Sequence, residues 1–124
     1  MLMICILFLF TITSLTIDNF HWFSDSLGQN SSIDISILVK KGNDLVKLGS
    51  YNGAIVFYNK ALAIDPNNIE ALYNKGNALV KLGDSIGATV LYDKALAIDP
   101  NNKKVLHNKG LLLFKLGNYT ELIK

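Results

Sequence analysis

The chain repeats itself with a period of 34 residues, and no other feature constrains its fold as strongly. A shift of 34 residues superposes Gly42 on Gly76 and Gly110. The same shift superposes the two identical segments AIDPNN at 63–68 and 97–102. So many matches at one offset do not arise from composition, and a period of this size is typical of stacked repeats. The sequence therefore predicts an array of similar units.

The first half of each unit has the spacing of an amphipathic helix. In the second copy, Leu72, Gly76 and Leu79 recur at three and four residues, which places them on one helix face. Gly83 is expected to end this helix, and Asp84 to cap the next one through its side-chain oxygen. The residues at that capping position in the three copies are Ser50, Asp84 and Asn118.

The second half of each unit predicts another helix. Ala88, Tyr92 and Ala95 again recur at helical spacing. The helix is expected to end at Asp99, because the residue before a proline is pushed out of helical geometry. The expected helices span residues 35–48, 51–64, 69–82, 85–98 and 103–116, with a sixth, frayed piece from Tyr119.

This helix–turn–helix unit resembles the tetratricopeptide repeat family. The positions that match the family are Gly42, Gly76 and Gly110; Leu48-Gly49, Leu82-Gly83 and Leu116-Gly117; Ala54 and Ala88; Tyr58 and Tyr92; Ala61 and Ala95; Pro66 and Pro100. The positions that depart from it include lysine before each first glycine (Lys41, Lys75, Lys109), Ser85 and Leu122. The resemblance implies an all-α fold, a right-handed superhelix of helix pairs.

The chain divides into an apolar start, a linker and the repeats. The expected parts are an apolar segment at 1–17, a linker at 18–34, full repeats at 35–68 and 69–102, and a truncated third repeat at 103–124.

The segment from Leu2 to Ile17 carries no charged residue. As a helix its sixteen residues would reach about 24 Å, which is shorter than the roughly 30 Å of a bilayer's hydrocarbon core. Three interpretations stay open: a cleaved signal peptide, an uncleaved membrane anchor, and an apolar element packed on the domain. The aromatic run Phe20–Phe23 suits an anchor at the headgroup level, or a cap on the first repeat. We expect an extracytoplasmic protein, secreted or anchored in a membrane.

Catalytic and metal-binding patterns are missing from the sequence. Cys5 is the single cysteine, so the chain forms no internal disulfide and no cysteine-based metal site. His21 and His107 have no cysteine or carboxylate at ligand spacing, and no phosphate-binding or nucleophile motif occurs. We therefore expect no enzyme, no cofactor and no nucleic-acid partner.

The resemblance implies a concave wall that binds peptide segments of a protein partner. The wall residues carried over by position are Asn43, Lys47, Tyr73, Asn74, Asn77, Lys81, Lys104, His107, Asn108 and Lys115. Residues 35–124 contain twelve lysines and seven acidic residues, a balance of +5, although the whole chain carries +2. The wall is therefore expected to favour an anionic segment.

One subgroup of the family holds a partner's C-terminal carboxylate with a clamp of lysines and asparagines. Asn43, Asn74 and Lys104 match that clamp by position, whereas Val39 and Asn108 replace two of its basic residues. We expect no clamp of this type.

Two functions follow from these features. The first is an exported or membrane-tethered module that binds a partner peptide in the groove. The second is an assembly protein that stacks with itself or with another repeat array through the open C-terminal end, because each repeat buries its apolar face only against its neighbours.

Overall fold

The structure, a computed structural model, describes residues 34–121, and the side chains of residues 34–117. This part contains five helices and no strand: residues 34–47, α2 (Tyr51–Ile64), α3 (Ile69–Lys81), α4 (Ser85–Ile98) and α5 (Lys103–Glu121). The apolar segment predicted at 1–17 and the linker predicted at 18–34 lie outside the described residues, except Asp34, which is already helical.

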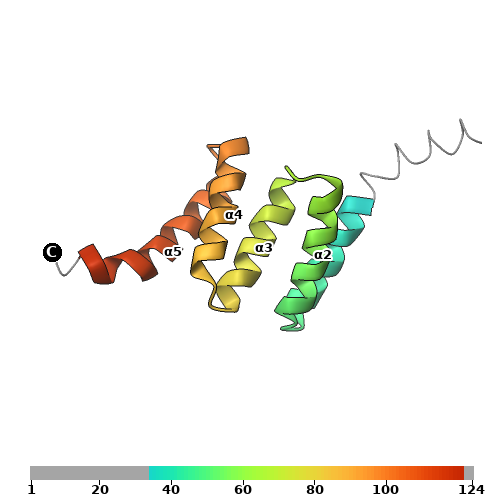
Figure 1. Cartoon of the computed structure of the whole chain (residues 1–124), viewed down its shortest axis with the longest axis horizontal. Helices are drawn as coiled ribbons and strands as arrows, with labels where there is room; N and C mark the ends of the chain where they lie inside the picture. Colours follow the sequence, from blue (N-terminus) through green and yellow to red (C-terminus); the bar gives the residue numbers. More distant parts are fainter. Residues whose placement is uncertain (1–33, 122–124) are drawn as a thin grey trace, which may run out of the picture. The chain divides into compact units, whose positions relative to one another are not determined.

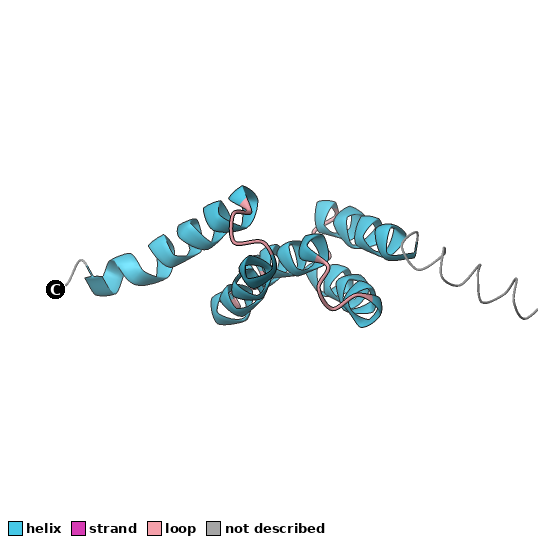
Figure 2. Cartoon of the chain, turned by 90° about the horizontal axis from the view of Figure 1, so that it is seen from above, coloured by secondary structure: helices cyan, strands magenta, loops and turns pink. Residues whose placement is uncertain are grey.

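The helices follow one another side by side, each packed on its neighbour in the chain. Figure 1 shows them in chain order from the helix at 34–47 to α5. In Figure 2, α2 and α4 lie on one side of the array, and the helix at 34–47 and α5 lie on the other. The predicted all-α solenoid is confirmed, and α3 packs on α2, α4 and α5.

The turn inside each complete pair depends on a glycine. Gly49 and Gly83 adopt φ angles of 77° and 87°, which residues with a Cβ atom rarely adopt. The following helix α4 is capped as predicted, because Asp84 Oδ1 accepts from the Gly87 backbone N–H at 2.8 Å. Ser50 makes no such side-chain bond at the start of α2, so the cap predicted there is wrong. The backbone angles at the two positions are nearly the same, φ −87° and ψ 71° at Ser50 and φ −86° and ψ 76° at Asp84, so the difference lies in the side chain.

The identical DPNN segments form the turns between repeats. Asp65 Oδ1 accepts from the Asn67 N–H at 3.0 Å, within the turn. Asn68 Oδ1 then accepts from the Ala71 N–H at 2.9 Å and caps α3. Asn102 caps α5 in the same way, through the Val105 N–H at 3.3 Å. The last asparagine of each segment is therefore the cap of the next helix.

The predicted end of the fifth helix is wrong. Helix α5 continues through Gly117 to Glu121, so no separate sixth piece begins at Tyr119, and Asn118 lies inside a helix instead of capping one. Gly117 does not have the positive φ of Gly49 and Gly83. After Gly49 and Gly83, the following helix packs against the helix before the turn and holds the turn in place. No helix follows α5 among the described residues, so its last glycine stays helical.

Two tyrosines form the centre of the core. Tyr58 and Tyr92 are each 1% exposed, and their rings lie on Gly42 and Gly76 of the preceding helix. A Cβ atom at Gly76 would lie 2.7 Å from Tyr92 Cε1, which is closer than real side chains approach. The periodic glycine therefore makes room for the ring of its own repeat.

Each tyrosine is enclosed by residues from three helices. The core cluster around Tyr58 contains Val39, Ala54, Tyr58, Ala61, Ala71 and Ala78. The cluster around Tyr92 contains Leu72, Ala88, Tyr92, Ala95, Val105 and Leu112. In both clusters the second helix of a pair is buried between its own first helix and the first helix of the next repeat. Four alanines at the helix contacts, Ala54, Ala61, Ala88 and Ala95, are fully buried, and larger side chains there would separate the helices.

The lysines that replace an apolar residue of the family pattern are accommodated at the surface. Lys41 lies over the ring of Phe57, with Nζ 5.8 Å from the ring centroid. Lys109 forms an ion pair with Asp93 of α4. Among residues 34–121, no helix has the length and apolar character that a membrane span requires.

The contact between Gly76 and Tyr92 gives a first prediction. Gly76→Ala should destabilise the fold by about 1–3 kcal/mol, because the added methyl group overpacks a buried ring. Gly117→Ala is the matched control: nothing lies within 4 Å of its Cβ position, and alanine favours a helix by about 1 kcal/mol over glycine. Thermal unfolding followed by circular dichroism checks both. Equal melting temperatures for the two variants would contradict the packing described here.

Candidate peptide-binding groove

The buried tyrosines connect the core to the polar wall. Tyr58 donates its hydroxyl proton to Asn43 Oδ1 at 2.7 Å, and Tyr92 donates to Asn77 Oδ1 at 2.5 Å. Each asparagine directly follows the glycine on which the ring lies. The ring is therefore buried while its hydroxyl reaches a partner at the edge of the groove, which satisfies a polar group that would otherwise be costly to bury.

A third asparagine joins the first helices of two repeats. Asn108 of α5 donates through Nδ2 to Asn77 Oδ1 at 2.8 Å and to the Tyr73 hydroxyl oxygen at 2.9 Å. Tyr73 also stacks on Tyr92 at a tilt, with their ring centroids 6.2 Å apart. These contacts fix the positions of the side chains between α3 and α5.

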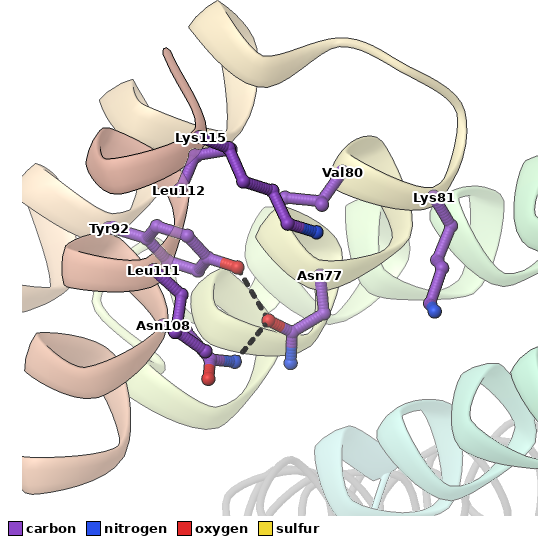
Figure 3. Close-up of a pocket in the computed structure, with 8 residues that line it drawn as sticks. All are labelled: Asn77, Val80, Lys81, Tyr92, Asn108, Leu111, Leu112 and Lys115. Carbon is purple, nitrogen blue, oxygen red and sulfur yellow. Dashed lines mark hydrogen bonds between the residues drawn. The ribbon is translucent and has the colours of Figure 1, made fainter. Parts of the chain in front are cut away.

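The first cavity on this wall, here called the Lys115 pocket, lies between α3 and α5 and has a volume of about 310 Å³. Its lining residues are Asn77, Val80, Lys81, Tyr92, Asn108, Leu111, Leu112 and Lys115. Figure 3 shows the Lys115 side chain reaching across the opening above Asn77, while Lys81 lies at the rim. The pocket thus combines an apolar floor, fixed amides and two cationic groups.

A second cavity, here called the Tyr73 pocket, lies beside the start of α3 and α5 and has a volume of about 450 Å³. Its lining residues are Asn43, Ile69, Glu70, Tyr73, Asn74, Asn102, Lys104 and Val105. Glu70 and Lys104 bring opposite charges to it, so this pocket has no net preference for an anion. The cationic character of the wall is concentrated in the Lys115 pocket.

Eight of the ten predicted wall residues line these two pockets. The two others, Lys47 and His107, line neither. Lys47 is exposed and forms an ion pair with Asp44, with Nζ and Oδ1 3.2 Å apart. The role of all ten residues in binding stays a prediction.

The wall asparagines Asn43 and Asn77 are also bonded to the core. Both carboxamide oxygens accept from tyrosine hydroxyls. Each amide is therefore part of the fold as well as of the wall, and it presents its Nδ2 group as a donor.

Several lining residues were missed at the sequence level. Leu111 and Glu70 are the most informative, because one adds an apolar floor and the other a negative charge. A signal for Leu111 was available, since it occupies the place that Asn43 and Asn77 hold in the earlier copies.

The position of Val39 bears on the carboxylate clamp. Val39 is 3% exposed and belongs to the first core cluster, so this position brings no cation to the groove. The carboxamide of Asn108, at the second replaced position, is bonded to Tyr73 and Asn77. No group of three or more metal-ligating side chains occurs among the described residues.

Three models of one family match the chain: a TPR repeat at residues 42–83, and tetratricopeptide repeats at residues 69–102 and 91–124. The chain belongs to the tetratricopeptide repeat family. No curated protein sequence matches it.

Solved structures of tetratricopeptide domains are similar to the chain. The first TPR of Spaghetti, bound to the HSP90 peptide SRMEEVD, is 29% identical over 73% of each chain, with a TM-score of 0.67. The TPR-containing domain of a Plasmodium falciparum FK506-binding protein is 30% identical over 77% of this chain and 63% of its own, with a TM-score of 0.67. A MamA double mutant is 29% identical over 70% of this chain and 49% of its own, with a TM-score of 0.65. The fold is the tetratricopeptide solenoid, and these structures support a protein-interaction module.

The tyrosine hydroxyls give a prediction in alkaline solution. Burial raises the pKa of both Tyr58 and Tyr92 from 10.0 to about 12, with smaller contributions from Glu70 and Tyr73 respectively. Because the folded state holds the proton more tightly, this stabilisation is complete below pH 10 and is lost as the pH rises to about 12. Urea unfolding between pH 9 and pH 12 measures this loss.

The matched control is the double variant Tyr58→Phe with Tyr92→Phe, which keeps every other ionisable group. We expect it to be less stable at pH 8, because two asparagine oxygens lose a donor, and to have a flatter pH dependence above pH 10. An unchanged slope in this variant would contradict the assignment.

Proposed function

We propose that the chain binds an extended peptide segment of a protein partner along the first helices of its repeats. The observation that supports this proposal best is the Lys115 pocket. Its amides are held in place by Tyr92 and Tyr73, and such fixed polar groups bind a ligand without the cost of ordering them first. Carboxamides pair well with a peptide backbone, because they both donate and accept hydrogen bonds.

The pocket's composition favours a particular ligand. Val80, Leu111 and Leu112 form an apolar floor that suits an aliphatic side chain. Lys81 and Lys115 at the opening attract a carboxylate beside that side chain. The preferred segment therefore carries an aliphatic residue next to aspartate or glutamate. The Spaghetti structures contain a peptide of related character, SRMEEVD, with three acidic residues.

Selection from a random heptapeptide library on the full chain tests this preference. We expect enrichment of aspartate or glutamate next to leucine, isoleucine, valine or methionine. The double variant Lys81→Glu with Lys115→Glu should bind a selected peptide about tenfold more weakly at low salt. In this variant, two exposed attractions between a lysine and a peptide carboxylate become repulsions between carboxylates. The difference should shrink as ionic strength rises.

Lys94→Glu provides the matched control, because Lys94 lies exposed on α4 and lines neither pocket. Lys47 is less suitable for this test, because its ion pair with Asp44 would be altered too. Selected peptides without acidic residues, or equal weakening by Lys94→Glu, would place the binding site elsewhere.

We also propose that the apolar segment Leu2–Ile17 directs the chain out of the cytoplasm or to a membrane. Its uncharged composition supports this proposal. Cell fractionation should find the full chain in the exported or membrane fraction, and a deletion that starts at Ser24 in the soluble cytosolic fraction. If both proteins remain cytosolic and soluble, the segment packs on the repeats.

A further inference from the structure

The Tyr73 pocket carries opposite charges on two neighbouring helices. Glu70 on α3 and Lys104 on α5 occupy the same repeat position, and both line the pocket. Both are exposed, and neither forms an ion pair with another described residue. Glu70 is the one acidic residue that lines either of the two wall pockets. Its carboxylate is therefore free to pair with a cationic group of a ligand.

Asn74 places a second acceptor beside Glu70. It lies four residues further along α3, so the two side chains are neighbours on the helix surface. Asn43 and Asn77 use their carboxamide oxygens for tyrosine hydroxyls. The Asn74 carboxamide, in contrast, makes no hydrogen bond with any described residue. A carboxylate next to a free carboxamide oxygen suits the N–H groups of a basic side chain.

The negative charge of Glu70 acts on the side of the pocket next to Asn43. Burial raises the pKa of Tyr58 to about 12, and the Glu70 carboxylate is the second cause of that rise. The Tyr58 hydroxyl donates to Asn43, which lines the same pocket. A cation beside Glu70 can therefore lie towards Asn43, whereas Lys104 belongs to α5.

The aromatic ring of this pocket favours arginine over lysine. Tyr73 is held in place, because its hydroxyl accepts from Asn108 and its ring contacts that of Tyr92. A guanidinium group is planar, so it can stack on such a ring while it donates two hydrogen bonds to a carboxylate. An ammonium group lacks this geometry.

The two wall pockets adjoin, since the Asn108 carboxamide is bonded to one residue of each. Glu70 and Lys81 are eleven residues apart on α3, and Lys104 and Lys115 are eleven residues apart on α5. Each pair therefore spans about 16 Å along its helix, at a rise of about 1.5 Å per residue. An extended peptide advances about 3.3 Å per residue, so about five residues cover this length.

We propose that the Tyr73 pocket binds an arginine side chain of the peptide, with Glu70 and Asn74 as its acceptors. The arginine lies about five residues from the carboxylate that pairs with Lys81 and Lys115. This inference rests on the proposed function, and it makes the preferred segment bipolar instead of only acidic. The arginine fixes the register of the segment in the groove, because other placements leave one of the two charges without a partner.

A displayed peptide library with the full chain as bait tests the spacing. Every peptide contains a fixed leucine–glutamate pair, and all other positions are random. Sequencing before and after selection gives the enrichment of arginine at each distance from the glutamate. At low salt we expect arginine to be enriched about fivefold at a distance of about five residues, compared with arginine directly beside the glutamate. The two placements have the same net charge, so this comparison removes the general effect of charge.

Substitutions of Glu70 test the pairing itself. Glu70→Gln keeps the size of the side chain and removes its charge, so the arginine enrichment should fall below about twofold. Glu70→Lys should enrich glutamate or aspartate at the same distance, in place of arginine. The matched control is Asp34→Asn, because Asp34 is also exposed in the first turn of its helix and lines neither wall pocket. It should leave the arginine enrichment unchanged.

Three results would overturn this inference alone: arginine enriched at no particular distance, the same enrichment in Glu70→Gln as in the unmodified chain, or an equal loss in Asp34→Asn. A second library with a fixed leucine–lysine pair separates this outcome from a failure of the proposed function. If the chain retains the leucine–glutamate library no better than the leucine–lysine library, the proposed function is wrong and this inference is wrong with it.

Discussion

The contact of a tyrosine ring with a glycine holds this array together. Tyr58 on Gly42 and Tyr92 on Gly76 let two helices approach closely, because neither contact leaves room for a Cβ atom. The ring also reaches the first helix of the next repeat, so one side chain stabilises the pair and the stacking of pairs. Repeats of this kind gain most of their stability from contacts with neighbouring repeats, and the tyrosine ring takes part in such a contact.

The same side chains set the geometry of the groove. Each hydroxyl leaves the core and donates to an asparagine at its edge, and Asn108 extends the connection to α5. Amides in the Lys115 pocket are thus positioned by the packing behind them, not by the groove surface alone. Loosening the core would therefore change the shape of the groove as well as the stability of the fold, since a buried hydroxyl and its acceptor move together.

Periodicity predicted four of the five described helices to within a residue at each end, and it placed the ring-bearing residues in the core. It failed at Gly117, although that glycine follows leucine just as Gly49 and Gly83 do. A left-handed turn is held by the helix that follows it, and local sequence does not report that helix. The resemblance to the family placed Asn77 at the wall, but it did not show that the Asn77 oxygen is already bonded. Position in a repeat predicts the side of a helix on which a residue lies. Its hydrogen-bond partners come from other helices, here Tyr92 of the same repeat and Asn108 of the next.

The third copy changes the chemistry of the groove where it departs from the first two. Leu111 stands at the position that asparagine occupies in the earlier copies, so this place loses a hydrogen-bond acceptor and gains an apolar surface. That surface is part of the floor of the Lys115 pocket, where we propose that an aliphatic side chain of the peptide lies. A single change at one repeat position thus alters the groove, because the first helices of successive repeats line it one after another.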